Sequence, residues 1–294
     1  MSGKTKKGIA FSNAEREGGR FVHTADLPDR EAGGKFHERR CGEMMDEVTI
    51  DEILGGRLKI RQSKRGYRFN LDSLMLAGFA SIKPRSVNLD LGCGNGILAL
   101  VLAGRHPLTR WVGLEIQEGL ANLARANVEQ NGLAGRISIV AGDARNAGKI
   151  FSNHSFDQVV FNPPYRKISS GRINPLSEKA IARHELQGAL ADFLAASKIL
   201  LKPKGRVFTI YPAARLVELV SLFRARGIEP KRMKLVFSDA SSDAVFVLAE
   251  GRSGSGEELK MEPPLYIYEE GKTYTPEMKK LFSDLAAFPE ACGG

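Results

Sequence analysis

The sequence predicts a doubly wound α/β fold, in which helices cover both faces of a mostly parallel, seven-stranded sheet. Short apolar runs alternate with segments of helical spacing from Val87 onward, and the connections between them are short. Such strand–helix–strand units form right-handed crossovers between parallel strands. Only a short segment separates the last two predicted strands, so we expect them to pair antiparallel as a hairpin at one edge.

The individual elements follow from the spacing of apolar residues. Strands are expected at residues 87–91, 111–116, 137–141, 156–161, 206–211, 232–237 and 245–250. Between them, apolar residues at helical spacing predict helices over residues 97–105, about 118–131, about 183–201 and 216–226. An additional amphipathic helix, ending at Ala80, is expected just before the first strand.

The rest of the chain suggests one domain with an appended arm. Residues 1–45 are polar and show no hydrophobic period, so we expect a flexible or disordered arm before a domain of residues 46–294. No stretch is apolar enough to cross a bilayer, and the amino terminus lacks the apolar segment of a signal peptide. Cys41, Cys93 and Cys292 lie far apart without a C-x-x-C pair, which favours a reducing cytoplasm and no zinc site.

A glycine-rich turn joins the first strand to the first helix after it. It reads Asp90-Leu91-Gly92-Cys93-Gly94-Asn95-Gly96, and its glycines allow a tight turn and a close approach of ligand to backbone. In doubly wound sheets, cofactors bind at the carboxyl ends of the strands, where this turn lies. The spacing G-x-G-x-G differs from the dinucleotide-binding G-x-G-x-x-G, so alone it indicates only a nucleotide-type ligand.

Acidic residues end the next two predicted strands. Glu115 can accept hydrogen bonds from two ribose hydroxyls, and Asp143, followed by Ala144, can accept one from an adenine amino group. Either acid alone can instead cap a helix. Because the turn and both acids lie at three successive strand ends, together they predict a site for an adenosine-containing cofactor.

The fourth strand runs into Asn162-Pro163-Pro164-Tyr165, a segment suited to methylation of an exocyclic amine. The lone pair of such a nitrogen is delocalised, so the site must align the amine and shift it toward tetrahedral geometry. The Asn162 oxygen and the Pro163 carbonyl can accept its two N–H bonds, and Pro164 leaves no competing donor. Tyr165 offers a face on which a planar group can stack.

Basic residues flank these segments. The net charge is +9, and six basic residues without an acid lie between Arg57 and Arg68. A second basic flank extends from Arg166 to Arg183, opposed only by Glu178. Either flank alone can be an ordinary solvated surface. Because both flank the proposed active-site segments, together they favour contact with phosphates, and we expect RNA as the partner. Within the first flank, the side chains of Tyr67 and Phe69 can wall the methionine end of a cofactor, stack on nucleic acid or fill the core.

The motifs resemble class I S-adenosylmethionine methyltransferases that act on amino nitrogens, and more narrowly the bacterial tRNA1(Val) adenine-N6 methyltransferase family. The stretches that carry the resemblance are QSKRGYRFNLDSLMLA, NLDLGCGNGILALVLA, VFNPPYRKISSGRINPLSEKAIARHE and EPPLYIYEEGKTYTPEM. It implies a Rossmann-like fold, S-adenosylmethionine as cofactor, and N6-methylation of the adenine beside the anticodon of a valine tRNA. It also implies a monomer or weak dimer without metal.

Other activities share this amine chemistry. Protein glutamine-N5 methyltransferases resemble chains with a helical amino-terminal domain, for which residues 1–45 are too polar. A guanine-N2 rRNA or adenine-N6 DNA methyltransferase is a further alternative, although the chain shows no target-recognition domain for DNA. A last alternative is an RNA-binding module that keeps the methyltransferase fold without the activity. The intact cofactor and acceptor residues argue against it.

Overall fold

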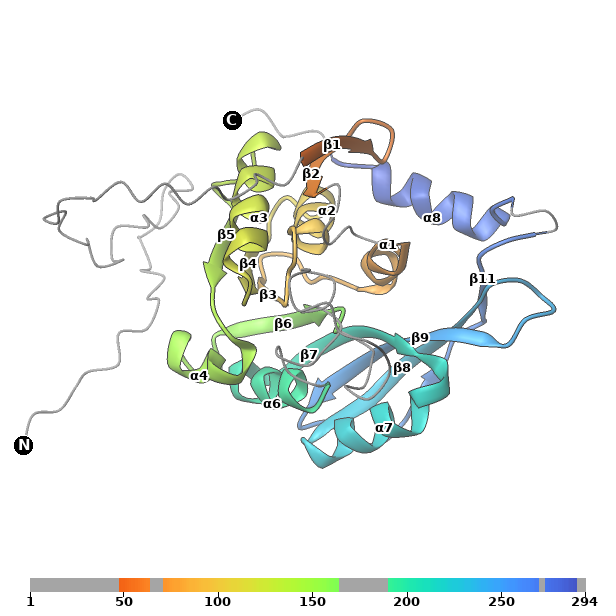
Figure 1. The fold of residues 1–294 in the computed structure, drawn as a ribbon. Helices are drawn as coiled ribbons and strands as arrows, with labels where there is room; N and C mark the ends of the chain where they lie inside the picture. Colours follow the sequence, from red (N-terminus) through yellow and green to blue (C-terminus); the bar gives the residue numbers. More distant parts are fainter. Residues whose placement is uncertain (1–47, 64–70, 164–189, 270–272, 290–294) are drawn as a thin grey trace, which may run out of the picture.

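The computed structural model describes residues 48–63, 71–163, 190–269 and 273–289 (Figure 1). Its main sheet consists of β3 (Val87–Leu91), β4 (Arg110–Glu115), β5 (Ile137–Ala141), β6 (Phe156–Phe161), β7 (Leu201–Pro212), β8 (Ile228–Phe237), β9 (Ala244–Ser253), β10 (Lys260–Met261) and β11 (Leu265–Tyr266). The strand order is β10-β8-β9-β7-β6-β3-β4-β5, and β11 also pairs with β8.

The seven predicted strands and their directions are confirmed. Strands β3 to β7 pair parallel, whereas β9 pairs antiparallel with both β7 and β8. The sheet has nine strands because β10 and β11, of two residues each, extend it along β8. Strands this short carry no periodic signal. Strand β8 also begins before the predicted residue 232, since Pro230 lies beside a bulge that interrupts the alternating pattern.

Helices cover both faces of the sheet, as expected for a doubly wound fold (Figure 1). One face carries α1 (Leu71–Phe79), α2 (Ile97–Arg105), α3 (Glu118–Gln130) and α8 (Pro276–Ala286). The other carries α4 (Ala147–Ile150), α6 (Leu190–Leu200) and α7 (Leu216–Ala225). Each layer encloses its own apolar core. None of the helices in the described ranges is long and apolar enough to span a membrane.

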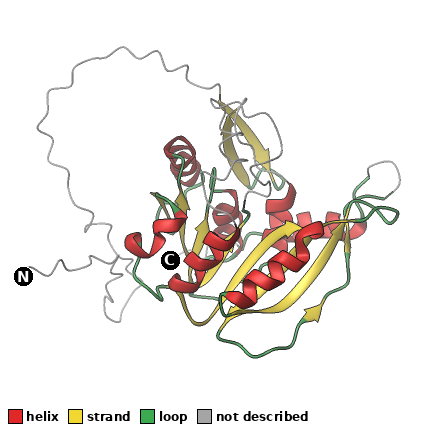
Figure 2. Cartoon of the chain, turned by 60° about the horizontal axis from the view of Figure 1, so that its bottom comes forward, coloured by secondary structure: helices red, strands yellow, loops and turns green. Residues whose placement is uncertain are grey.

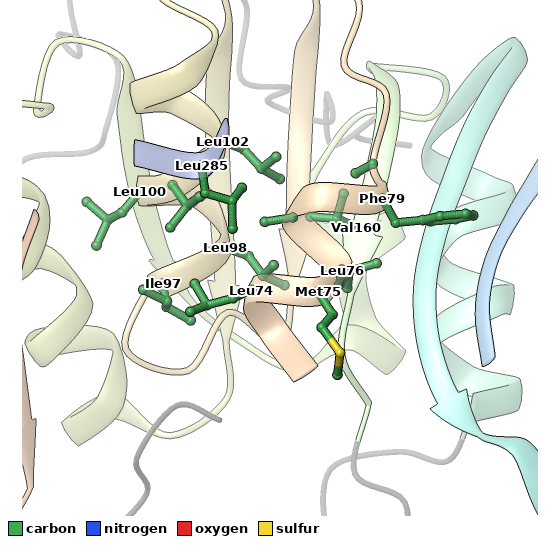
Figure 3. Packing of buried hydrophobic residues seen from close by; sticks show 14 of the residues in the cluster. Leu74, Met75, Leu76, Phe79, Ile97, Leu98, Leu100, Leu102, Val160 and Leu285 are labelled. Atoms are coloured by element: carbon green, nitrogen blue, oxygen red, sulfur yellow. The ribbon is translucent and has the colours of Figure 1, made fainter. Parts of the chain in front are cut away.

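Helix α1 is held in the first of these cores. Its Leu74 packs among Leu98 of α2 and other buried leucines, and Leu285 of α8 closes the same cluster (Figure 3). At its far end the Phe79 ring meets Phe208 of β7 edge to face. Each fully buried leucine contributes about 1.5–3 kcal/mol, so this packing holds α1 firmly. The beginning of α1 is thereby held beside the end of β6.

A separate antiparallel hairpin precedes α1 and was not predicted. It consists of β1 (Val48–Ile53) and β2 (Leu58–Ser63), and lies apart from the main sheet (Figure 2). Alternate residues of β2 are buried, with Leu58 and Ile60 in the core that contains α1 and α2. The alternation of β2 is a strand signal, but its charged residues read equally well as a basic surface segment.

Candidate active site

The glycine-rich turn has the tight geometry that the sequence predicts. Gly92, Gly94 and Gly96 have φ angles of +73°, +57° and +85°, in the left-handed region that favours glycine. The N–H groups of Gly92 and Cys93 both donate to the Leu114 carbonyl, at 2.7 and 3.0 Å. The turn between β3 and α2 is therefore bonded directly to the end of β4.

Asp90, the acidic residue of β3, supports this turn through a hydrogen bond to the start of α2. Its Oδ2 accepts a hydrogen bond from the Ala99 N–H at 3.2 Å, one of the orphan donors at the start of α2. The side chain is only 1% exposed, and burial, together with the charge of Glu115, raises its pKa to about 7. Asp90 thus supports the turn while its carboxyl is almost completely removed from water.

Glu115 lies against the turn, at the end of β4. One carboxylate oxygen accepts from the Gly94 N–H and the other from the Gln117 N–H, both at 2.9 Å. Burial raises the pKa of this carboxyl as well. A carboxylate oxygen has about two acceptor positions. Each oxygen of Glu115 can therefore bond the protein and a ligand hydroxyl together.

Cys93 packs against Gly113 of β4, a contact that the sequence did not predict. A Cβ at Gly113, in the middle of β4, would stand 2.8 Å from the Cys93 sulfur, so Cys93 packs where β4 has no side chain. Burial raises the pKa of the Cys93 thiol well above its usual range. Cys93 is therefore an inert packing residue that seats the turn, and Gly113 is required for that fit.

Asp143 occupies the predicted place, at the end of β5, but its carboxylate already has a partner. It accepts from the Arg145 N–H at 2.8 Å and pairs with the Arg145 guanidinium at 2.6 Å, in a capping arrangement. These hydrogen bonds hold the pKa of Asp143 below its usual range. The Arg145 side chain must move before Asp143 can accept from an adenine. Ala144 beside it is buried.

Asn162 directly follows β6, at the same edge of the sheet as the turn. Val160 pairs with Asp90 in the parallel register, which places Asn162, two residues on, one strand from Gly92. Neighbouring strands are about 4.8 Å apart. The Asn162 Nδ2 donates to Ser73 Oγ at 3.4 Å, and Ser73, in the first turn of α1, was not foreseen as a site residue.

Four of the predicted site residues cannot be placed. Pro163 follows Asn162 and is buried, whereas Pro164, Tyr165, Tyr67 and Phe69 lie outside the described residues. The same holds for the basic flank from Arg166 to Arg183. Of the first basic flank, the structure describes three basic side chains, all exposed on or beside β2: Arg57, Lys59 and Arg61.

The turn contains buried polar atoms that await partners. Asp90 Oδ1 and both polar atoms of the Asn95 amide are buried and have no hydrogen-bond partner among the described residues. Buried polar atoms are ordinarily bonded, so three such atoms in one turn indicate a place that a ligand completes. A ligand with a positive charge and hydroxyl groups suits the two carboxylates, Asp90 and Glu115.

Comparisons with known proteins agree with this geometry. Residues 72–212 match the family described as Methyltransferase small domain. The fold is similar to the crystal structure of a predicted O-methyltransferase from Agrobacterium tumefaciens, with a TM-score of 0.61 and 21% identity. That match covers 74% of this chain and 98% of the other.

Curated relatives are closer in sequence. The chain is 30% identical to a tRNA1(Val) (adenine(37)-N6)-methyltransferase from Histophilus somni over 230 residues, which cover 76% of this chain and 92% of the relative. It is 34% identical to an enzyme of the same name from Porphyromonas gingivalis, over 55% of this chain and 66% of the relative. The chain therefore belongs to the tRNA1(Val) (adenine(37)-N6)-methyltransferase family.

Proposed function

We propose that this protein transfers the methyl group of S-adenosylmethionine to N6 of an adenine in tRNA, the adenine beside the anticodon of a valine tRNA. The observation that carries the proposal is the position of Asn162, one strand from the glycine turn and at the same edge of the sheet. An amide acceptor next to a nucleoside-type site is the arrangement that amine methylation requires. The names of the curated relatives support tRNA as the substrate.

The cofactor supplies a methyl group already activated on a sulfonium, so the protein has to bind and orient it. Asp90 and Glu115 are buried carboxyls whose charged forms a cationic ligand would stabilise, and the glycines allow its close approach. The residues proposed to bind it are Tyr67, Phe69, Asp90, Gly92, Gly94, Gly96, Glu115, Asp143, Ala144 and Asn162.

The acceptor side consists of hydrogen-bond acceptors held in a rigid turn. The Asn162 oxygen and the Pro163 carbonyl accept the two N–H bonds of the adenine amine and draw its hydrogens out of the ring plane. Ser73, by accepting from the Asn162 Nδ2, orients that amide with its oxygen turned away from α1. The Tyr165 ring stacks on the adenine. No strong base is needed, because the amine becomes cationic when it is methylated and then loses its proton readily.

Asn162→Ala tests the proposal in one assay. Unmodified tRNA is incubated with labelled S-adenosylmethionine, and nucleosides are identified by mass spectrometry. We expect labelled N6-methyladenosine with the wild type and at least a roughly hundredfold slower transfer with Asn162→Ala, because an aligned acceptor is lost. Calorimetry should show that the variant still binds the cofactor.

Asn153→Ala is the matched control, since this exposed asparagine lies before the opposite end of β6. It should methylate at the wild-type rate. Equal rates for Asn162→Ala and the wild type would remove Asn162 from the mechanism. A parallel reaction contains release-factor protein in place of tRNA, and label on its glutamine with none in tRNA would overturn the substrate.

A further inference from the structure

Asn127, on the buried side of α3, joins two parts of the molecule with one amide. Its Oδ1 accepts from the Arg61 N–H at 2.7 Å, and its Nδ2 donates to the Arg61 carbonyl at 3.1 Å. The same Nδ2 donates to the Asn95 carbonyl in the glycine turn at 3.0 Å. The side chain is fully buried. The donors and the acceptor of this amide are therefore all used, between the hairpin and the turn.

Asn131, one helical turn later, makes the same contacts to the hairpin. Its Oδ1 accepts from the Lys59 N–H at 2.9 Å, and its Nδ2 donates to the Lys59 carbonyl at 2.8 Å. Four helical residues rise about 6 Å and two strand residues about 6.8 Å, so the two amides match alternate residues of β2. Together they bond β2 as a neighbouring strand would.

The third bond distinguishes the two asparagines. The remaining N–H of Asn131 donates to the Asn127 carbonyl of its own helix, at 2.7 Å. The corresponding N–H of Asn127 donates instead to the carbonyl of Asn95 in the turn. The Asn95 side chain itself has no hydrogen-bond partner among the described residues. Chain neighbours of Asn95 are Gly94, bonded by Glu115, and Gly96, in the left-handed region. The peptide groups of the turn are thus held by Glu115 on one side and by Asn127 on the other.

We propose that Asn127 is a positioning residue for methyl transfer, which fixes the cofactor turn through the Asn95 carbonyl and ties it to the basic hairpin. The inference rests on the proposed function, because it takes the turn as the cofactor site, and it adds that the hairpin, through its exposed basic side chains, contacts the RNA. A turn of three left-handed glycines has little stiffness of its own. The hydrogen bond from Asn127 to the Asn95 carbonyl therefore fixes the backbone of the turn in the conformation that binds the cofactor.

The test compares Asn127→Asp with Asn131→Asp. Each aspartate keeps the size of the side chain and the acceptor for the hairpin N–H, and each loses the amide donors. We expect Asn127→Asp to weaken the affinity for S-adenosylmethionine about tenfold, the effect of one lost buried hydrogen bond. Asn131→Asp should leave that affinity within about twofold of the wild type, while both variants raise the KM for tRNA.

Circular dichroism checks that each variant is folded, and Asn127→Ser replaces Asn127→Asp if the buried charge unfolds the protein. Equal cofactor affinities for the two asparagine sites would overturn the inference, since a purely structural role would affect both alike. A wild-type protein that does not bind S-adenosylmethionine in the same calorimeter would overturn the proposed cofactor itself, which separates the two failures.

Discussion

Asp90 and Glu115 bring two carboxylates into one small, buried turn. Both have raised pKa values because burial penalises their charged forms, and their mutual repulsion adds to the shift at Asp90. Few protein donors offset this cost: the Ala99 N–H donates to Asp90, and the N–H groups of Gly94 and Gln117 donate to Glu115. A cationic ligand would stabilise the charged forms, which supports the proposal that these two residues bind the cofactor.

The raised pKa of Asp90 predicts a pH-dependent stability. Its pKa is about 7 in the folded protein and near the model-peptide value of 3.8 in the unfolded chain. Between these values the folded state holds a proton that the unfolded state has lost, so this contribution to the free energy of unfolding falls as pH rises from about 4 to about 7.

Asp90→Asn removes this titration while its amide oxygen can still accept from Ala99. Urea unfolding between pH 4.5 and 8 should show the variant gaining stability relative to the wild type as pH rises. The gain should level off above about pH 7. A difference between the two proteins that stays constant across this range would contradict the shifted pKa.

Helix α1 carries Ser73, which bonds the Asn162 amide, in its first turn, and its carboxyl end is held by Arg232. At its carboxyl end, Arg232 of β8 donates to the Phe79 carbonyl at 2.8 Å and stacks over the Phe79 ring at 4.1 Å. The same guanidinium pairs with Glu250 and Glu262, at 2.9 and 2.8 Å. A planar, five-donor group can make all these contacts together, and it also satisfies a carbonyl at the end of the helix.

Arg232→Lys is expected to lower the free energy of unfolding by about 2 kcal/mol, because an ammonium can neither stack in this way nor bond two glutamates and a carbonyl at once. Urea unfolding monitored by circular dichroism measures the change. Arg226→Lys, at an exposed position after α7, controls for the general effect of the exchange. Equal stability of the two variants would show that the Arg232 contacts contribute nothing measurable.

At the scale of the whole molecule, the glycine turn and the β1–β2 hairpin are bonded to the same helix, α3. Arg57, Lys59 and Arg61 are exposed on or beside β2, and α3 bonds β2 to the glycine turn. The net charge of +9 adds a long-range attraction for a polyanion. At the far side of the sheet, the loop after β8 carries Asp239, which accepts from the hydroxyls of Ser241 and Ser242. On the hairpin itself, Glu52 of β1 pairs with Lys59 at 3.3 Å, and we propose that the three exposed basic side chains of β2 and its turn contact RNA.

Binding of tRNA should therefore depend on salt through the hairpin. The paired substitutions Arg57→Gln and Lys59→Gln are expected to weaken tRNA binding and to reduce the slope of log affinity against log salt by up to about two, because two phosphate contacts are lost. Filter binding over a range of potassium chloride measures the slope. Lys83→Gln with Arg85→Gln, exposed in the segment before β3, is the matched control. An unchanged slope for the hairpin variant would exclude these contacts.

Much of the fold and the outline of the site follow from local patterns. The strands, most of the helices and the turn at residues 90–96 obey rules of periodicity and backbone conformation that act within about ten residues. The predicted positions of Glu115, Asp143 and Asn162 at strand ends needed only the parallel arrangement of the strands. The hydrogen bond between Asp143 and Arg145 is also local, and it is the capping role that the sequence offered as the alternative for this acid.

The sequence by itself determined the sheet, the glycine turn and the kind of chemistry, because each is encoded in residue types at short spacing. Only the tertiary structure decided which distant groups hold the site. Ser73 meets Asn162 across 89 residues, and Asn127 meets Arg61 across 66. Such hydrogen bonds depend on how α1 and α3 pack on the sheet, and a polar residue in a helix carries no local mark of the partner it will find.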